Sequence, residues 1–334
     1  MAHKALPKRE MPNLIDSWRE HAAVVGPVHV GDLVEFQRLT SSSDAALESM
    51  TNSRVPPKAL FLPQSEVMFR ATGNDLVSTS DEVSPRVVLA IRPCDARALQ
   101  LLDTVLLADP QDPYWAGRRE ATTIVALGCD DPCETCFCTT VGSGPFDSRG
   151  ADALLTKLGD TYVAEVLTEK GQALLTDLPD ASQQQVEETG AVQASAANRM
   201  KRPFQPTGIK EKLNSLFESD FWREVQQSCL GCGVCTFLCP TCFCFDIVDE
   251  AQRRERVRNW DTCMFRLYSQ EASGHNPRPT NIHRTRQRIM HKYAYWLELI
   301  KEIGCTGCGR CVRYCPVDLD IRHIVSRAQA CEED

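Results

Sequence analysis

The sequence predicts an α/β N-terminal domain followed by a C-terminal domain that is mainly α-helical. Two apolar runs, residues 87–91 (VVLAI) and 123–127 (TIVAL), are typical of buried parallel strands. The composition changes near residue 205, and beyond it large apolar side chains recur at helical spacing over residues 209–225. We therefore expect two domains, residues 1–205 and 206–334, each long enough to bury a core.

The first domain is expected to end in a linker at about 180–205. Residues 180–200 are rich in Gln, Ser, Ala and Glu and contain few large apolar groups. Such a composition indicates either a linker or an exposed, loosely held helix.

Composition limits the compartment and the partners of the chain. No apolar run is long enough to cross a bilayer, and residues 1–10 lack the apolar core of a secretory signal. An odd number of cysteines, 17, without such a signal points to a reducing cytoplasm. The net charge of −8 argues against nucleic acid as a partner.

The two predicted strands place cysteines at one edge of a sheet. Residues 96–107 between the runs read as a helix, so the segment forms a right-handed strand–helix–strand unit. Cys94 and Cys129 then follow the carboxyl ends of two parallel strands, where open α/β sheets bind ligands. Asp95 is placed to cap the N-terminus of the helix.

Eight cysteines repeat one spacing, Cys-x2-Cys-x2-Cys-x3-Cys-Pro. The first copy begins at Cys229 and the second at Cys305. This is the signature of bacterial ferredoxins with two 4Fe-4S clusters, in which the fourth cysteine of each copy binds the other cluster. The expected ligands of cluster 1 are Cys229, Cys232, Cys235 and Cys315, and those of cluster 2 are Cys305, Cys308, Cys311 and Cys239. A zinc ribbon would instead show two separated Cys-x2-Cys pairs.

Iron–sulfur chemistry also explains the glycines inside both copies. Glycine adopts positive φ and lets backbone N–H groups approach the cluster sulfurs, which tunes the reduction potential. These glycines are Gly231, Gly233, Gly307 and Gly309.

A third 4Fe-4S cluster is our hypothesis for the N-terminal domain. Cys136 and Cys138 follow Cys129 closely and can converge with Cys94 and Cys129 at the sheet edge. The alternative is that these are buried free thiols, because cysteine is among the most buried residue types.

The C-terminal domain is expected to carry its cysteine loops on helices, as a ferredoxin-like α-helical domain. An amphipathic helix over residues 209–225 leads into the first loop, and helices are expected over 246–258 and 284–303. Basic residues are dense in the last two segments. They are either solvated helix faces or charges that stabilise an anionic cluster and attract an acidic partner.

Four cysteines fall outside these sets. Cys242, Cys244 and Cys263 either face the first ferredoxin cluster or help to form another site. Cys331 lies in an acidic tail and is expected to be inert.

The chain resembles one family from about residue 87 to residue 321. The segments that carry the likeness are IRPCDARAL, CDDPCETCFCTTVGSGP, CLGCGVCTFLCPTCFCFDI, WDTCMF, ASGHNPR, RQRIMHK and CTGCGRCVRYCPVDLDI. They are similar to the iron–sulfur β subunit of cytoplasmic sulfhydrogenase-type NiFe hydrogenases and to its iron–sulfur counterpart in anaerobic sulfite reductase. The family's N-terminal cysteines correspond to Cys94, Cys129, Cys136 and Cys138. Cys133 stands where a small residue is expected, so it could substitute for a neighbouring ligand.

The resemblance implies a non-catalytic electron-transfer subunit of a hetero-oligomer. Such a subunit relays electrons between a flavin subunit that binds FAD and handles NAD(P)H and a catalytic redox subunit. Hydrogenase, sulfite reductase and heterodisulfide-reductase-like partners are all open. Two alternatives stand beside it: a reductase that itself binds flavin in the N-terminal domain, and a structural or regulatory iron–sulfur module.

Overall fold

A computed structural model describes residues 2–48, 52–80 and 83–331, and a seven-stranded sheet dominates its N-terminal half. Four central strands are parallel, and both edges are antiparallel. In spatial order the strands are β1 (His3–Pro7), β9 (Thr161–Val166), β8 (Ala153–Leu158), β7 (Thr122–Leu127), β6 (Arg86–Ile91), β2 (Ala23–Val30) and β3 (Leu33–Arg38). The predicted strands at 87–91 and 123–127 are confirmed as the neighbours β6 and β7.

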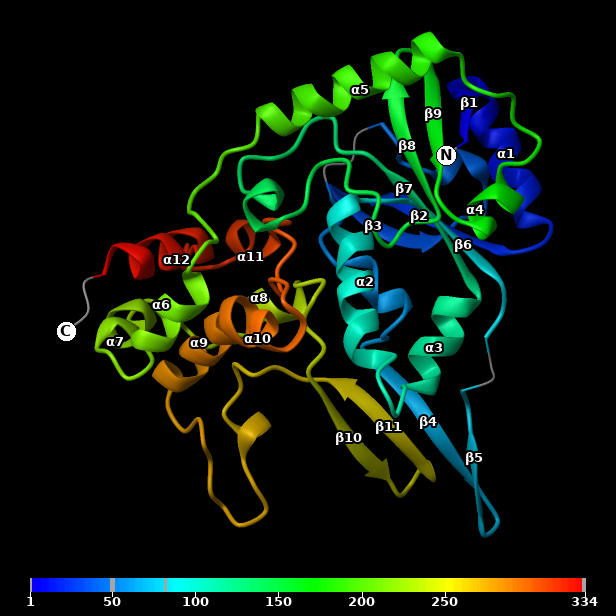
Figure 1. Ribbon diagram of the computed structural model, residues 1–334. Coiled ribbons are helices and arrows are strands. Elements are labelled where there is room, and N and C mark those ends of the chain that lie inside the picture. Colours follow the sequence, from blue (N-terminus) through cyan, green and yellow to red (C-terminus); the bar gives the residue numbers. More distant parts are fainter. Residues whose placement is uncertain (1, 49–51, 81–82, 332–334) are drawn as a thin grey trace.

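Alternation along β6 and β7 divides the apolar side chains between two cores. Val87 and Val125 face α1 (Met11–Arg19), whereas Val88 and Ile124 face α2 (Pro93–Leu106). The second core also holds Trp115 of α3 (Pro113–Glu120). Helices therefore cover both faces of the sheet, which explains why these strands are apolar throughout (Figure 1).

The helix expected after β6 is confirmed, but the predicted role of Asp95 is wrong. The N-cap position of α2 is Arg92, and Asp95 lies in the first helical turn. Its carboxylate is buried and forms an ion pair with Arg310 of the C-terminal half. The Asp95 side chain therefore binds a residue far away in the sequence and does not take the capping role that the local pattern predicts.

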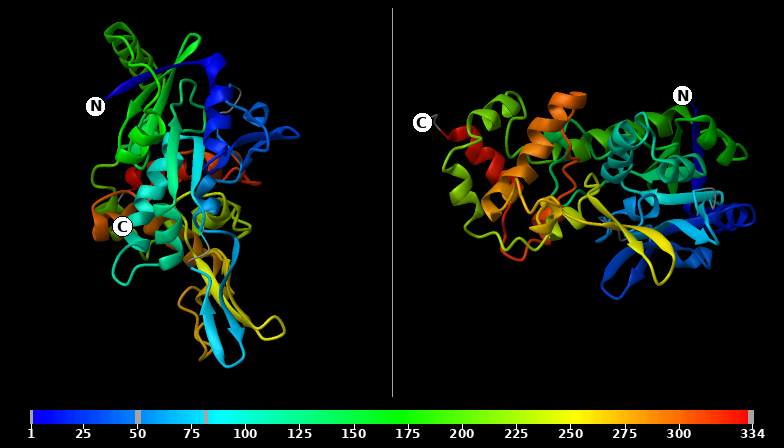
Figure 2. Two further views of the ribbon diagram at one scale, coloured as in Figure 1. Left: turned by 90° about the vertical axis from the view of Figure 1, so that its right-hand side faces the viewer. Right: turned by 90° about the horizontal axis from the view of Figure 1, so that it is seen from below.

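A second, four-stranded antiparallel sheet contradicts the helix expected at residues 246–258. Its order is β10 (Phe245–Glu250), β11 (Glu255–Trp260), β4 (Ser65–Thr72) and β5 (Asp75–Ser78). β-Branched residues recur along the β10–β11 hairpin, and β11 finds a partner in distant β4. This sheet extends away from the larger one (Figures 1 and 2). Its strands come from both sides of residue 205 in the sequence. The domain boundary expected at that residue stays a prediction.

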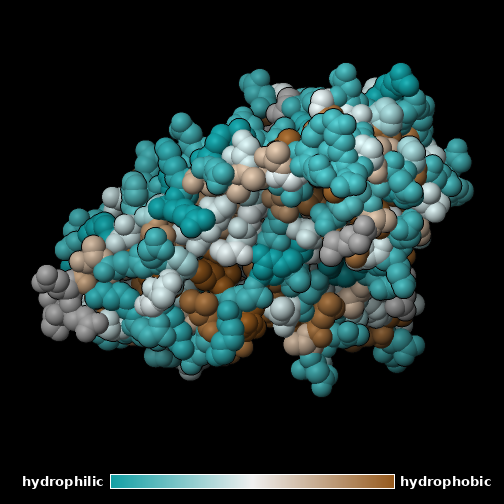
Figure 3. All heavy atoms as spheres, turned by 45° about the horizontal axis from the view of Figure 1, so that its top comes forward, coloured by the Kyte–Doolittle hydropathy of each residue, from teal (hydrophilic) through white to brown (hydrophobic). Residues whose placement is uncertain are grey.

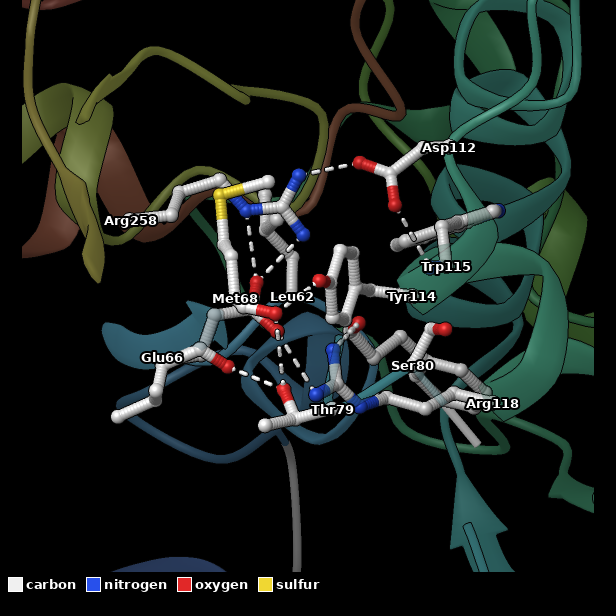
Figure 4. Close-up of polar contacts among 12 residues, drawn as sticks. Leu62, Glu66, Met68, Thr79, Ser80, Asp112, Tyr114, Trp115, Arg118 and Arg258 are labelled. Atoms are coloured by element: carbon white, nitrogen blue, oxygen red, sulfur yellow. Dashed lines mark hydrogen bonds and ion pairs between the residues drawn. The ribbon is translucent and has the colours of Figure 1, made fainter. Parts of the chain in front are cut away.

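Buried charges attach the four-stranded sheet to α3. Glu66 of β4 accepts a hydrogen bond from Arg258 Nε of β11 at 2.7 Å and pairs with Arg118 Nη2 of α3 at 2.7 Å. Arg258 also pairs with Asp112, the residue that caps α3. Figure 4 shows this network around the Tyr114 ring. The sheet's central strand pair is thus tied to the N-terminal half.

The segment at 180–205 contains an exposed helix, α5 (Gln183–Asn198), which confirms one of the two predicted interpretations. Ser182 and Gln185 form a capping box at its start, and only Thr189 and Ala196 are buried. The helix runs from the seven-stranded sheet toward the C-terminal helices (Figure 1).

The C-terminal half is a group of helices around the cysteine loops. The amphipathic stripe expected over 209–225 forms two helices, α6 (Ile209–Ser215) and α7 (Phe221–Gln226), whose apolar side chains share one core. The helix expected over 284–303 is confirmed as α9 (Asn281–Met290), the π-helical turn η6 (His291–Tyr295) and α10 (Trp296–Ile300). The remaining helices are α4 (Glu169–Leu174), α8 (Val234–Phe237), α11 (Arg310–Arg313) and α12 (Ile321–Ala330).

Five short 3-10 turns complete the described elements: η1 (Lys8–Glu10), η2 (Ser42–Asp44), η3 (Pro57–Leu60), η4 (Cys138–Val141) and η5 (Leu267–Ser269). Within the described ranges, no helix has the length and apolar character that a bilayer crossing requires. The face in Figure 3 is mainly hydrophilic, with apolar side chains gathered in its lower middle. Residues 332–334 of the acidic tail lie outside the described part.

Candidate iron–sulfur sites

The four cysteines proposed for the N-terminal cluster line one cavity. Cys94 opens α2 beside the end of β6, and Cys129 follows β7. Cys136 and Cys138 enter from the loop that leads into η4. The predicted convergence at the carboxyl edge of the parallel strands is therefore present in the fold. Gly307 and Cys308 of the second cysteine motif close the same cavity.

A second cavity gathers the set expected for cluster 1. Cys229, Cys232 and Cys235 line it from the first motif, and Cys315 reaches it from the second. Met264, Thr285 and Arg288 lie on its other walls. Cys232 is exposed, so this cavity lies close to the molecular surface.

A third cavity gathers the set expected for cluster 2. Cys305, Cys308 and Cys311 line it together with Cys239 from the first motif. The fourth cysteine of each motif thus crosses to the cavity of the other motif, which is the arrangement that the two-cluster spacing predicts. The ligand roles of these cysteines remain a prediction that the folded positions fit.

The glycines between the cysteines adopt the positive φ that the sequence pattern predicts. Gly231 and Gly307 have φ of +67° and +65°, and each directs its N–H at the sulfur of the cysteine two residues earlier, at 3.4 Å. A Cβ at Gly307 would lie 2.5 Å from the Cys138 backbone nitrogen. Glycine therefore allows both the N–H···S contacts and the close approach of the two halves of the chain.

The three cavities follow one another in a row. Cys308 lines both the N-terminal cavity and the cavity of the Cys305 set. The backbone N–H of Phe137 donates to the Gly307 carbonyl at 2.8 Å, which joins the two loops. The crossing of Cys239 and Cys315 joins the second and third cavities. The order is therefore Cys94 set, Cys305 set, Cys229 set.

Cys133 does not line the N-terminal cavity. Its sulfur lies 2.8 Å from that of Cys136 and accepts a hydrogen bond from Arg313 Nη2 at 2.6 Å. The hydrogen bond with Cys136 is the largest cause that lowers the pKa of Cys133 to about 5. Thr135 and Arg313 also lower this pKa, whereas burial raises it. Cys133 therefore borders a candidate ligand, and the geometry favours Cys136 as the residue facing the cavity.

The three remaining cysteines of the first loop region lie next to these sites without lining the three cavities. The buried thiol of Cys242 contacts that of Cys239. Cys244 contacts Cys263 and Tyr268, and the hydrogen bond with Cys263 is the largest cause that lowers its pKa to about 6. These pairwise contacts place Cys242 behind a candidate ligand of cluster 2.

Buried cations surround the cysteines, and sequence reasoning missed most of their positions. Lys292 is 3% exposed and donates to Cys239 Sγ at 3.1 Å. Lys58 of η3 is also buried, lies over the Trp260 ring and donates to the Cys242 carbonyl. Burial is the main cause that lowers the pKa of Lys58 to about 8. Arg258, Arg288 and Lys292, from the two basic segments, are buried and therefore do not lie on solvated helix faces. Arg288 and Lys292 lie beside cysteines, which fits the alternative interpretation of these charges.

The donor sets fit cubane clusters better than single metal ions. Across the described ranges, no three His, Cys, Asp or Glu side chains converge as closely as one bound ion requires. In a cubane each thiolate binds a different iron, so the four sulfurs stand farther apart. Thr285 and Arg288 line the cavity of the Cys229 set. Three of their buried side-chain atoms have no hydrogen-bond partner among the described residues: Thr285 Oγ1, Arg288 Nε and Arg288 Nη2. Such free donors are expected beside the sulfides of a cluster, which accept hydrogen bonds.

The fold and the cysteine sets define an iron–sulfur protein. Residues 228–319 match the protein family described as 4Fe-4S dicluster domain. The chain is 30% identical over 327 residues to sulfhydrogenase 2 subunit beta of Pyrococcus furiosus, a match that covers 96% of both chains. The chain therefore belongs to the family of sulfhydrogenase beta subunits. No solved structure matches it significantly.

Proposed function

We propose that this chain relays electrons, one at a time, through three 4Fe-4S clusters in a hetero-oligomeric redox complex. The observation that carries the proposal is the row of three cavities, each lined by four cysteines of one predicted set. A 4Fe-4S cluster held by four thiolates accepts and releases a single electron. The end cavities are those of the Cys94 set and the Cys229 set, so electrons enter at one and leave at the other.

The protein's own groups would control each cluster. Twelve cysteines hold the irons, and backbone N–H groups of Gly231 and Gly307 direct positive charge at cysteine sulfurs. Buried Lys292 lies beside Cys239, and fixed positive charge stabilises the more negative, reduced state.

The relative's name supports a hydrogenase-type complex as the setting. We infer that a flavoprotein carrying FAD and handling NAD(P)H contacts one end of the relay and that a catalytic redox subunit contacts the other. This setting implies a soluble cytoplasmic complex. Purification of a tagged chain from its native source, followed by mass spectrometry of co-eluting subunits, tests the partner types.

Iron and acid-labile sulfide per chain test the relay itself. Protein purified without oxygen should contain about twelve of each, since each cubane holds four irons and four sulfides. About eight would restrict clusters to the dicluster domain and favour a flavin-binding N-terminal domain, which flavin absorbance would then reveal. Clusters that fail to cycle reversibly in a redox titration would identify a structural or regulatory module instead.

A further inference from the structure

One face of the helix formed by α9 and η6 carries four polar side chains toward the dicluster cavities. They are Asn281, Thr285, Arg288 and Lys292, spaced by four, three and four residues. This spacing places all four on one side of a helix. Three of them, Thr285, Arg288 and Lys292, are 5% exposed or less, although polar side chains are costly to bury unless they find partners.

The two ends of this face contact cysteines of both motifs. Asn281 donates its side-chain amide to the Cys229 carbonyl at 2.8 Å. Lys292 donates to Cys239 Sγ at 3.1 Å and is held by Thr241 Oγ1 at 3.0 Å and the Gly304 carbonyl at 3.1 Å. The face therefore begins beside the cavity of the Cys229 set and ends beside the cavity of the Cys305 set.

The two middle residues hold polar atoms at the cavity of the Cys229 set that find no partner among the described residues. Thr285 and Arg288 line the cavity of the Cys229 set, and Thr285 Oγ1, Arg288 Nε and Arg288 Nη2 have no hydrogen-bond partner in the described part of the chain. Cys235, one of the ligands expected for cluster 1, lines the same cavity as Arg288.

A buried guanidinium whose Nε and Nη2 groups have no acceptor among the described residues needs negative charge nearby. A thiolate-ligated cubane in the cavity of the Cys229 set would supply it, and its inorganic sulfides would accept the free N–H and O–H groups. The π-helical turn η6 lies where the face passes from Arg288 to Lys292. Such turns are frequent at functional sites.

We propose that this polar face of α9 and η6 sets the reduction potentials of the two dicluster clusters, with Thr285 and Arg288 acting on the cluster of the Cys229 set and Lys292 on the cluster of the Cys305 set. The inference rests on the proposed function. Reduction adds one electron to an anionic cluster, so a fixed cation or hydrogen-bond donor stabilises the reduced state more than the oxidised one. Removal of such a group lowers the potential.

The test is an EPR-monitored redox titration of the full chain, purified without oxygen, with iron and sulfide measured in the same samples. Arg288→Met should shift the ratio of oxidised to reduced cluster about tenfold at fixed potential for the cluster of the Cys229 set, about 59 mV for one electron. Arg286→Met is the matched control. Arg286 lies on the same helix but bonds to the Phe217 carbonyl and Glu218, outside the three cavities, so both potentials should remain unchanged.

Two further variants keep the test decisive if Arg288→Met loses iron. Thr285→Val should lower the potential of the Cys229-set cluster alone, and Lys292→Met that of the Cys305-set cluster alone. Unchanged potentials in the variants that retain full iron would overturn the inference while leaving the relay intact. A wild-type chain without reversibly reducible clusters would overturn the proposed function itself.

Discussion

Arg310 and Asp95 form a buried, two-pronged ion pair between the two halves of the chain. Arg310 Nη1 and Nη2 lie 2.6 and 2.7 Å from the two Asp95 oxygens, and the side chains are 0% and 2% exposed. Asp95 follows Cys94, and Arg310 stands between Cys308 and Cys311. The pair therefore holds the N-terminal cavity against the cavity of the Cys305 set.

Removal of Arg310 should be costly because it leaves the Asp95 carboxylate buried without a counter-charge. We expect Arg310→Met to lower the free energy of unfolding by about 3–5 kcal/mol. The control is Arg327→Met, which breaks an exposed pair with Glu224 and should cost about 1 kcal/mol or less. Denaturant titration of both variants, purified without oxygen, measures the difference. Equal losses would show that the buried pair has no special role.

Of the two neighbouring thiols Cys136 and Cys133, only Cys136 should be a ligand of the N-terminal cluster. Cys136 lines the cavity, whereas Cys133 lies behind it beside Arg313. We expect Cys136→Ala to lose about four irons per chain and Cys133→Ala to keep the full content. Iron analysis of the two variants checks this. The reverse result would make Cys133 the substitute ligand.

Acid should weaken the fold through His291. Burial, followed by the charge of Lys292, lowers the pKa of His291 from 6.5 to about 4, and its Nε2 accepts a hydrogen bond from Trp296 Nε1 at 3.1 Å. Between pH 6.5 and 4 the unfolded chain binds a proton that the folded chain does not. Stability therefore falls as the pH falls through this window, by roughly 3 kcal/mol in total.

Unfolding measured between about pH 7 and 4.5 in wild type and His291→Gln tests this contribution. Glutamine keeps an acceptor for Trp296 but does not titrate, so the variant should lose less stability with acid. Parallel pH profiles for the two proteins would exclude His291 as a source of acid sensitivity.

The Glu66 network should anchor the four-stranded sheet. Glu66→Gln leaves Arg258 and Arg118 with one anionic partner fewer, in a site where Glu66 and Arg258 are almost fully buried. We expect a loss of about 3–5 kcal/mol and faster amide hydrogen exchange in β4 and β11. Asp249→Asn breaks an exposed ion pair with Arg256 on the same sheet and should change both the stability and the hydrogen exchange only slightly. Comparable exchange in both variants would contradict the anchoring role.

Sequence patterns were sufficient where the signal is local. The apolar runs of β6 and β7 and the repeated cysteine spacing led to the correct strands and to three cysteine sets that share cavities. They failed where a distant partner decides. The hairpin of β10 and β11 is stabilised by pairing with β4, which lies far away in the sequence.

Charge patterns left two interpretations open for a similar reason. Arg288 and Lys292 belong to a dense basic stretch that fits either a solvated helix face or charges beside an anionic cluster, and both are buried beside cysteines. Only the folded structure shows which side of that helix meets the cavities. Asp95 likewise fits a local capping pattern, and its actual partner is 215 positions away.

The second cysteine motif contributes to all three cavities, and this has a consequence for biosynthesis. Gly307 and Cys308 complete the N-terminal cavity, Cys311 the cavity of the Cys305 set, and Cys315 that of the Cys229 set. Each cavity therefore lacks a wall until the ribosome has translated this segment. A chain that stops before Gly307 would contain none of the three cavities in complete form.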